Sequence, residues 1–112
     1  MEARLPAHLE VSGLIRRVEA EGGFGMVLSK GERDAGTIMV VLTHRGDQSR
    51  AYERMPQLDG TRAWTLSKRQ DADDPLAFSD FLDRRGRQDP DLWVVELDIA
   101  EGERFLDLPI EI

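Results

Sequence analysis

The chain has 112 residues, of which 40% are apolar and 33% are charged, so it can build one hydrophobic core and suits a single domain over residues 1–112. It contains no cysteine, which excludes disulfides, thiolate zinc sites and thiol catalysis, and it has no long apolar run, so we expect no membrane span, no signal peptide and a cytoplasmic location. The net charge of −7 at pH 7 disfavours non-specific binding to nucleic acid.

Residues 8–21 are predicted to form the first helix. Their apolar positions follow the i, i+3, i+4, i+7 spacing of an amphipathic helix, and Gly22-Gly23 would end it. Apolar residues then alternate with others over residues 24–29, which is typical of a half-buried strand. The charged, turn-forming residues 30–36 are expected to join this strand to the next one in a hairpin.

The middle of the chain predicts three more strands. Residues 37–42, TIMVVL, are apolar on both faces, which favours a central strand covered on both sides. Residues 50–55 and 61–66 are predicted as two further strands, with a tight turn of positive φ at Asp59-Gly60. Pro56 cannot donate a hydrogen bond to a neighbouring strand, so its own strand is expected to end early or to lie at an edge.

The last part of the chain predicts a second helix and a final strand. Asp74 and Pro75 are typical of a helix start, with an acidic cap followed by proline at the first helical position. Residues 92–99 are predicted as a strand, and the apolar residues from Phe105 onward are expected to pack back on the body. The order α-β-β-β-β-α-β predicts an α+β fold, or a three-layer α/β/α arrangement, with a mixed, mostly antiparallel sheet of about five strands and two main helices.

The acidic excess lies at the C-terminal end of the chain. Residues 89–112 contain eight acidic side chains against one basic side chain, Arg104. This indicates either a solvated surface that keeps the protein soluble or a docking face for a basic partner. The acidic residues are Asp89, Asp91, Glu96, Asp98, Glu101, Glu103, Asp107 and Glu111.

Two segments of the chain are distinctive: Gly31-Glu-Arg-Asp-Ala-Gly36 before an apolar strand, and Asp89-Pro-Asp-Leu-Trp-Val-Val-Glu-Leu97 near the end. With the Leu-Ile-Arg-Arg helix upstream, the chain resembles, from about residue 4 to residue 108, a bacterial family of short proteins known only as a domain of unknown function (number fourteen-ninety-one). The resemblance implies a single stand-alone cytoplasmic domain. It implies no activity, cofactor or catalytic residue.

The sequence lacks the common catalytic and metal-binding patterns. It contains neither of the glycine-rich phosphate-binding motifs, and its two histidines, His8 and His44, lie on different predicted elements. Glu96 and Asp98 would point to one side of a strand and could share a Mg²⁺ ion, although a solvated or arginine-paired strand face is the alternative. The sequence therefore predicts no metal site and no cofactor, and it identifies no catalytic residue.

One cluster of interface-type residues remains, on the two strands around Asp59-Gly60. Tyr52, Arg54, Arg62 and Trp64 would lie close together, and these residue types are favoured in protein interfaces. Cross-strand packing is the alternative explanation for the same four residues. The leading prediction is a non-enzymatic protein-binding or adaptor module that contacts its partner through these residues or through the acidic C-terminal end.

The alternative prediction is a small enzyme or a binder of an anionic or phosphorylated metabolite. Lys30, Arg33 and Asp34 would form the rim of its pocket, since the backbone N–H groups and two cations of this loop could hold an anion. An ordinary charged hairpin explains the same loop. A third possibility is a structural subunit of a homodimer, and the sequence alone leaves the partner, the substrate and the oligomeric state open.

Overall fold

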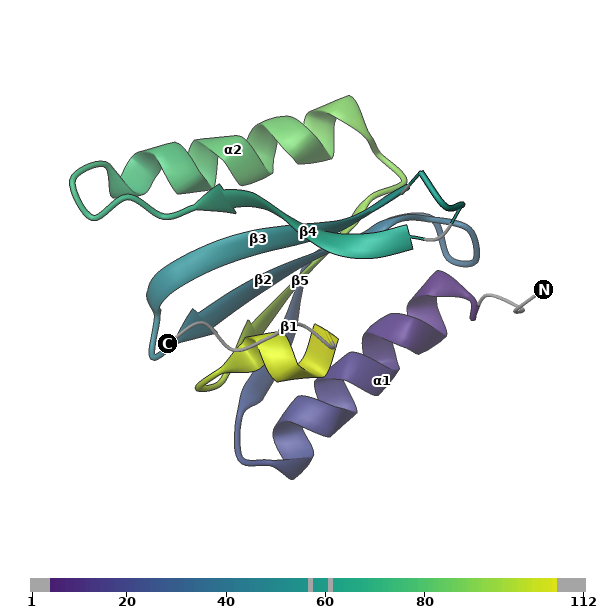
Figure 1. Cartoon of the computed structure of the whole chain (residues 1–112), viewed down its shortest axis with the longest axis horizontal. Coiled ribbons are helices and arrows are strands. Elements are labelled where there is room, and N and C mark those ends of the chain that lie inside the picture. Colours follow the sequence, from purple (N-terminus) through teal and green to yellow (C-terminus); the bar gives the residue numbers. More distant parts are fainter. Residues whose placement is uncertain (1–4, 57, 61, 107–112) are drawn as a thin grey trace.

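The fold is a five-stranded mixed sheet with a helix packed on each face (Figure 1). The computed structural model describes residues 5–56, 58–60 and 62–106. The elements are α1 (Ala7–Ala20), β1 (Phe24–Ser29), β2 (Ile38–His44), β3 (Asp47–Pro56), β4 (Arg62–Arg69), α2 (Pro75–Gln88), β5 (Trp93–Asp98) and the 3₁₀ helix η1 (Gly102–Leu106). The strand order in the sheet is β1-β5-β2-β3-β4, in which β2 and β5 are parallel and the other neighbours are antiparallel. The predicted order of elements and the mostly antiparallel sheet are therefore confirmed.

Both helices bury apolar residues against the sheet, and α1 does so with the spacing that the sequence predicts. α1 packs Val11, Leu14 and Val18 against one face of the sheet, and α2 packs Phe78 against the other. Asp74 stands at the N-cap of α2, but its side chain makes no capping hydrogen bond, which differs from the expected acidic cap. α2 is therefore held in place by its packing and by proline at its first position.

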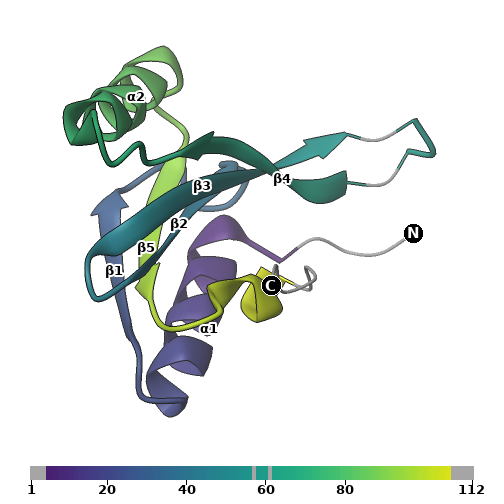
Figure 2. The ribbon, with the colours of Figure 1, turned by 60° about the vertical axis from the view of Figure 1, so that its left-hand side comes forward.

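The connection between β1 and β2 differs from the predicted hairpin. β5 lies between these two strands, antiparallel to β1 and parallel to β2, so residues 30–37 cross two strand spacings, about 10 Å. Burial explains the difference. Trp93, Val94 and Val95 at the start of β5 are buried on both faces, and such a strand belongs inside a sheet, whereas β1 takes the edge (Figure 2).

β2 lies at the centre of the sheet, as its apolar sequence predicts. Residues 38–43 are all buried, because α1 covers one face of the strand and α2 the other. The core on the α1 side consists of Ala7, Val11, Leu14, Val18, Ile38, Val40, Leu42, Tyr52, Trp93, Val95, Leu97, Ile99, Phe105 and Leu106, and the core on the α2 side of Met39, Val41, Ala51, Phe78, Leu92 and Val94.

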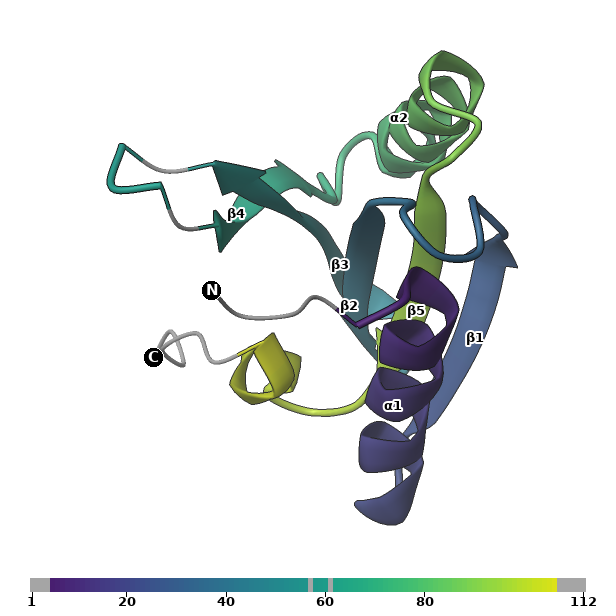
Figure 3. The same cartoon turned by 90° about the vertical axis from the view of Figure 1, so that its right-hand side faces the viewer.

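Two further predictions concern the hairpin and the tail. β3 and β4 pair as a hairpin that extends beyond the rest of the sheet (Figure 3), and Gly60 in its turn has the predicted positive φ, +85°. η1 buries Phe105 and Leu106, as expected for the start of the tail, while residues 107–110 of that tail lie outside the described residues.

Among the residues that the structure describes, no helix is long and apolar enough to cross a membrane.

Candidate functional site

The four residues predicted as a contact patch lie on β3 and β4, with different degrees of exposure. Tyr52 is buried at 5% exposure, and Trp64 is half-buried against the core. Arg54 forms an ion pair with Glu10 of α1 at 2.5 Å and stacks on Trp64, with its guanidinium carbon 4.9 Å from the ring centroid. Arg62 is exposed near the hairpin turn. These contacts are those of cross-strand and helix–sheet packing, and a partner surface at these residues stays a prediction.

The loop predicted to hold an anion binds a carboxylate of its own. Glu32 Oε2 accepts hydrogen bonds from the backbone N–H groups of Ala35 (2.5 Å) and Asp34 (2.9 Å), and these bonds lower the pKa of Glu32. The side chains of Lys30, Arg33 and Asp34 are exposed, with Arg33 Nε 3.8 Å from Asp34 Oδ1. Two of the N–H groups that would receive a phosphate are therefore occupied.

The same loop is clamped against the segment that precedes β5. The Glu32 N–H donates a hydrogen bond to Asp91 O (3.0 Å), and Trp93 Nε1–H donates one to Glu32 O (2.7 Å). A Cβ atom added at Gly31 would lie 2.1 Å from Asp91 O, and one added at Gly36 would lie 2.4 Å from the same atom. The two backbones approach this closely because glycine has no side chain. These contacts join the two segments that carry the family resemblance and give both a structural role.

The acidic residues of the C-terminal end do not share one surface. Glu103 lies on the α1 side of the sheet, next to Tyr52. Glu96 and Asp98 point to the α2 side, because they alternate along β5 with Val95 and Leu97, which face α1. Asp107 and Glu111 lie outside the described residues. In the described part of the chain the acidic side chains therefore form separate groups rather than one docking face.

An exposed apolar row runs along β1. Phe24 and Met26 point to the α2 side of the sheet, and Leu28, at a shift in the β1 register, lines a hollow with residues of α2; the three side chains are 72%, 59% and 43% exposed. The opposite side of β1 is partly covered by α1, whose Ile15 packs close to Gly25, while Val27 on that side is 36% exposed. Single exposed apolar residues are ordinary on a protein surface, but three on one face of one strand form a patch of the kind found at binding sites. We call these three residues the β1 row.

The β1 row leads into a hollow of about 230 Å³ between β1 and α2. Leu28 and Val94 line it from the sheet, and Leu82, Ser79 and Asp83 line it from the helix. We call this hollow the α2 groove. It offers an apolar lining with one acidic side chain, and it is continuous with the β1 row through Leu28.

Two carboxylates border the β1 row on the neighbouring strand. The register of β1 and β5 places Glu96 opposite Met26 and Asp98 opposite Phe24. Burial, and then the nearby charge of Asp98, raises the pKa of Glu96 above its usual value. Asp98 Oδ1 accepts the backbone N–H of Arg45 at 2.7 Å, whereas Glu96 has no hydrogen-bond or ion-pair partner among the described residues. A positive charge placed here would stabilise both carboxylates.

The two edges of the sheet differ in charge. β4 carries Arg62, Lys68 and Arg69, and charged side chains protect an edge strand from pairing with another chain. β1, at the other edge, has the sequence FGMVLS and no charged residue. Sequence reasoning missed this site because it paired residues 24–29 with the following strand. The available signal was the alternation of large apolar residues in a segment without any charge.

A second, polar hollow of about 540 Å³ lies at the end of the sheet where β2 and β5 finish. Its lining includes His44, Arg50, Arg69, Gln70, Glu101 and Glu103, and we call it the corner hollow. Three non-glycine residues beside it, Arg45, Gln48 and Glu101, have φ of +55°. Backbone in this left-handed region is strained for such residues and often marks functional sites.

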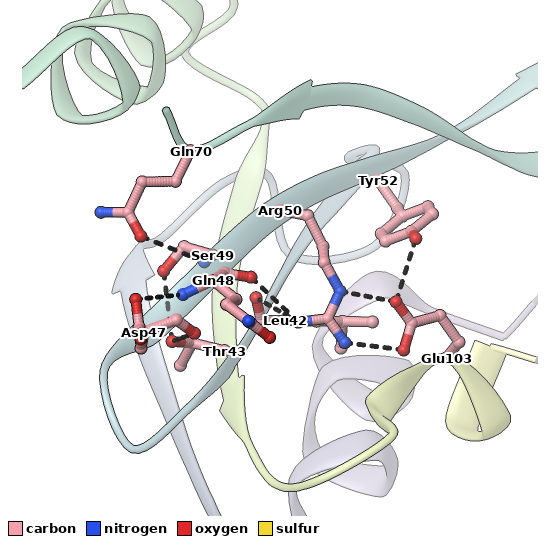
Figure 4. A network of polar contacts seen from close by, with 9 residues as sticks. All are labelled: Leu42, Thr43, Asp47, Gln48, Ser49, Arg50, Tyr52, Gln70 and Glu103. Carbon is pink, nitrogen blue, oxygen red and sulfur yellow. Dashed lines mark hydrogen bonds and ion pairs between the residues drawn. The ribbon is translucent and has the colours of Figure 1, made fainter. Parts of the chain in front are cut away.

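One wall of the corner hollow is a closed ion-pair network (Figure 4). Arg50 donates from Nε to Glu103 Oε2 (2.5 Å) and from Nη2 to Oε1 (2.7 Å), and the Tyr52 hydroxyl donates to Oε2 (3.2 Å). The hydrogen bonds from Arg50 lower the pKa of Glu103 although burial opposes this shift. The network ties η1 to β3. No group of three or more histidine or acidic side chains among the described residues is placed to hold a metal ion.

The chain is similar to proteins of one family. The model of a family described as protein of unknown function (DUF1491) matches residues 5–107. A crystal structure of a DUF1491 family protein from Caulobacter crescentus is 34% identical with a TM-score of 0.78, over 96% of this chain and 100% of that one. A solution structure of a protein from A. tumefaciens is 33% identical with a TM-score of 0.74, over 98% of both chains. A search of the curated proteins gave no match.

Proposed function

The chain belongs to the DUF1491 family of proteins of unknown function, and from its surface we propose that it is a cytoplasmic protein-binding module that holds a segment of a partner protein along β1. The observation that carries the proposal is the β1 row, three large apolar side chains on an uncharged strand at the edge of the sheet. An edge strand of this kind, left uncovered, favours aggregation. A partner segment lying on it would bury the row.

The surroundings of the β1 row also favour a protein ligand. The α2 groove, at about 230 Å³, lies below the usual size of small-molecule sites, roughly 300–1,000 Å³, and suits a single side chain. Leu28 and Leu82 give it an apolar lining, and Glu96 and Asp98 lie beside the row. An apolar centre with charged groups at its border is the usual composition of a protein interface.

Replacing Phe24 and Met26 together with threonine is expected to weaken partner binding by about two orders of magnitude. Burying each of these side chains in the complex would contribute roughly 1.5 kcal/mol to the free energy of binding. Threonine removes most of this apolar surface but retains the propensity for a strand. A photo-crosslinking amino acid at position 26 of the full chain, expressed in a bacterial cell, would identify the partner. Calorimetry on the purified pair would then give the dissociation constants of wild type and of the Phe24→Thr/Met26→Thr variant.

The matched control is Leu66→Thr, which makes the same kind of change on the opposite edge strand, at a residue that is 37% exposed. It should bind the partner as the wild type does. Equal affinity of the double variant and the wild type, with both folded by circular dichroism, would reject β1 as the binding surface. Crosslinks to a second copy of the chain alone would replace the proposal with a homodimer.

The corner hollow favours a second candidate function, the binding of a small anionic metabolite. Its volume of about 540 Å³ falls in the range of ligand sites, and His44 and Arg69 contribute to its lining, while Arg50 there is paired with Glu103. The three left-handed residues around it are the specific observation that supports this candidate. The anion would lie here, and not at the loop of residues 30–36, where Glu32 already occupies the N–H groups.

Inorganic phosphate and pyrophosphate are expected to raise the melting temperature of the wild type if the corner hollow binds anions, because a ligand of the native state adds stability by mass action. Arg69→Ala should remove this increase. Arg62→Ala, on the same strand but outside the lining of the hollow, should keep it. Differential scanning fluorimetry at constant ionic strength gives the measurement, and equal shifts in all three proteins would reject this site.

A further inference from the structure

We propose, building on the protein-binding function above, that the partner adds an extended segment to the sheet beside β1 and directs a lysine or arginine side chain toward Glu96 and Asp98. The ligand is thus a peptide segment whose residues on one face are apolar at the ends and basic in the middle. Three features of the described residues lead to it: the edge position of β1, the spacing of the β1 row, and the two carboxylates on β5.

The edge position favours an added strand over an added helix. β5 pairs with only one side of β1, so the backbone N–H and C=O groups on the other side have no strand partner among the described residues. Those groups are a template for another strand, and peptides use such edges in known recognition modes. β4, the other edge, carries three basic residues, so the same pairing is opposed there.

The spacing of the β1 row selects the side chains of the added strand. Neighbouring strands lie about 5 Å apart, and side chains on one face recur at every second residue. Two successive residues on this face of the partner segment would therefore lie beside Phe24 and Met26, and the next one would lie near Leu28, where the register of β1 with β5 shifts. The outer two would contact apolar surface, and the one near Leu28 would also reach the α2 groove.

The carboxylates select the middle residue. Glu96 lies opposite Met26 on β5, which is two strand spacings, about 10 Å, from an added strand. A lysine or arginine can lay its apolar stem over Met26 and place its charge near Glu96. Glu96 is half-buried beside Asp98 and has no cationic partner among the described residues, so a basic side chain would relieve the repulsion between the two.

A second copy of this chain fits the site less well than a basic partner. Its own edge strand, FGMVLS, supplies apolar side chains but no cation. Each copy also carries a net charge of −7, which opposes self-association. The partner is therefore expected to be a different protein whose extended segment contains lysine or arginine.

The test uses the full chain and a synthetic peptide, Thr-Leu-Thr-Lys-Thr-Leu-Thr, at millimolar concentration. We expect its binding to shift the backbone amide resonances of β1, to slow hydrogen exchange of the β1 amides that face away from β5, and to give cross-strand nuclear Overhauser effects to β1. The same peptide with glutamate in place of lysine should bind about tenfold more weakly. High salt should reduce that preference, because it screens the charges.

The matched variant is Glu96→Gln/Asp98→Asn, which retains the side-chain shapes and removes both charges. It should bind the lysine and glutamate peptides within about a factor of two of each other. Equal binding of the two peptides to the wild type overturns the inference, as does a bound lysine peptide without protection of β1 amides, or no perturbation of β1 at all.

These outcomes are separate from the test of the proposed function. If the natural partner still loses affinity in the Phe24→Thr/Met26→Thr variant while the peptides show no charge preference, β1 remains the binding surface and the basic strand is rejected. If the natural partner binds that variant as tightly as the wild type, both proposals fail together. If sedimentation shows a homodimer of the wild type and a monomer of the Phe24→Thr/Met26→Thr variant, a second copy of the chain is the ligand of β1.

Discussion

Replacing Gly31 with alanine is expected to destabilise the protein by at least about 3 kcal/mol, enough to unfold a large fraction of a marginally stable domain. The new Cβ atom would lie 2.1 Å from Asp91 O and 2.6 Å from the carbonyl carbons of Asp91 and Leu92. All three are backbone atoms, so no side chain can turn aside. The backbone itself is fixed, because Glu32 and Trp93 bond across the same contact.

The control for this substitution is Gly13→Ala. Gly13 lies inside α1, and a Cβ atom added there would meet no atom within 4 Å. Alanine is favoured over glycine in a helix, so this variant should gain about 0.5–1 kcal/mol. Urea denaturation of both variants measures the difference directly. If Gly31→Ala unfolds at the same urea concentration as the wild type, the close approach of the two segments is not required for stability.

The Gly31 contact also explains which part of the fold the sequence could predict. Local patterns, such as the helical spacing in residues 8–21 and the apolar run TIMVVL, depend on neighbouring residues and gave the elements correctly. The contact of Gly31 with Asp91 joins residues that are 60 positions apart in the sequence, and the spacing of apolar residues along the chain does not predict such a contact. The segment 30–36 therefore resembled a hairpin turn, although in the structure it packs against the residues that precede β5.

The order of the strands in the sheet could not be predicted from the sequence for a related reason. Hydrophobic alternation shows that residues 24–29 form a strand with one buried face, but it does not say which strand lies beside it. The strand order is decided by the burial of β5 on both faces. After α2 returns the chain across the sheet, this burial favours a place for β5 inside the sheet, between β1 and β2, over a place at its edge. With β5 inserted, β1 becomes an edge and its apolar side chains become a surface.

The sequence identifies candidate contact residues by their amino-acid type, but only their exposure in the structure shows which of them can reach a partner. Tyr and Arg are common in interfaces, yet Tyr52 lies in the core and Arg54 is held by Glu10. Phe24 and Met26 belong to a strand predicted to be half-buried, yet both of their side chains are exposed. A residue type states what a side chain can do when exposed, and tertiary packing decides whether it is.

Removing the carboxylate of Glu103 is expected to cost about 3–5 kcal/mol, because Glu103→Ala leaves the guanidinium of Arg50 without its partner in a largely buried site. The side chains of Arg50 and Glu103 are only 12% and 10% exposed. The control is Glu21→Ala, which breaks an exposed ion pair with Arg104 and should change stability by less than about 1 kcal/mol. Replacing Arg50 and Glu103 together with leucine should recover most of the loss, since no buried charge remains.

The same network predicts how stability depends on pH. Arg50 lowers the pKa of Glu103 in the folded protein below its value in the unfolded chain, so the unfolded state binds the proton more tightly. The stabilisation is therefore fully present above the unfolded pKa, about 4.3, and is lost as pH falls through the folded pKa. Urea denaturation from pH 7 down to pH 3 should show the Arg50→Leu/Glu103→Leu variant losing less stability than the wild type. Parallel pH profiles for the two proteins would show that this ion pair does not contribute to acid sensitivity.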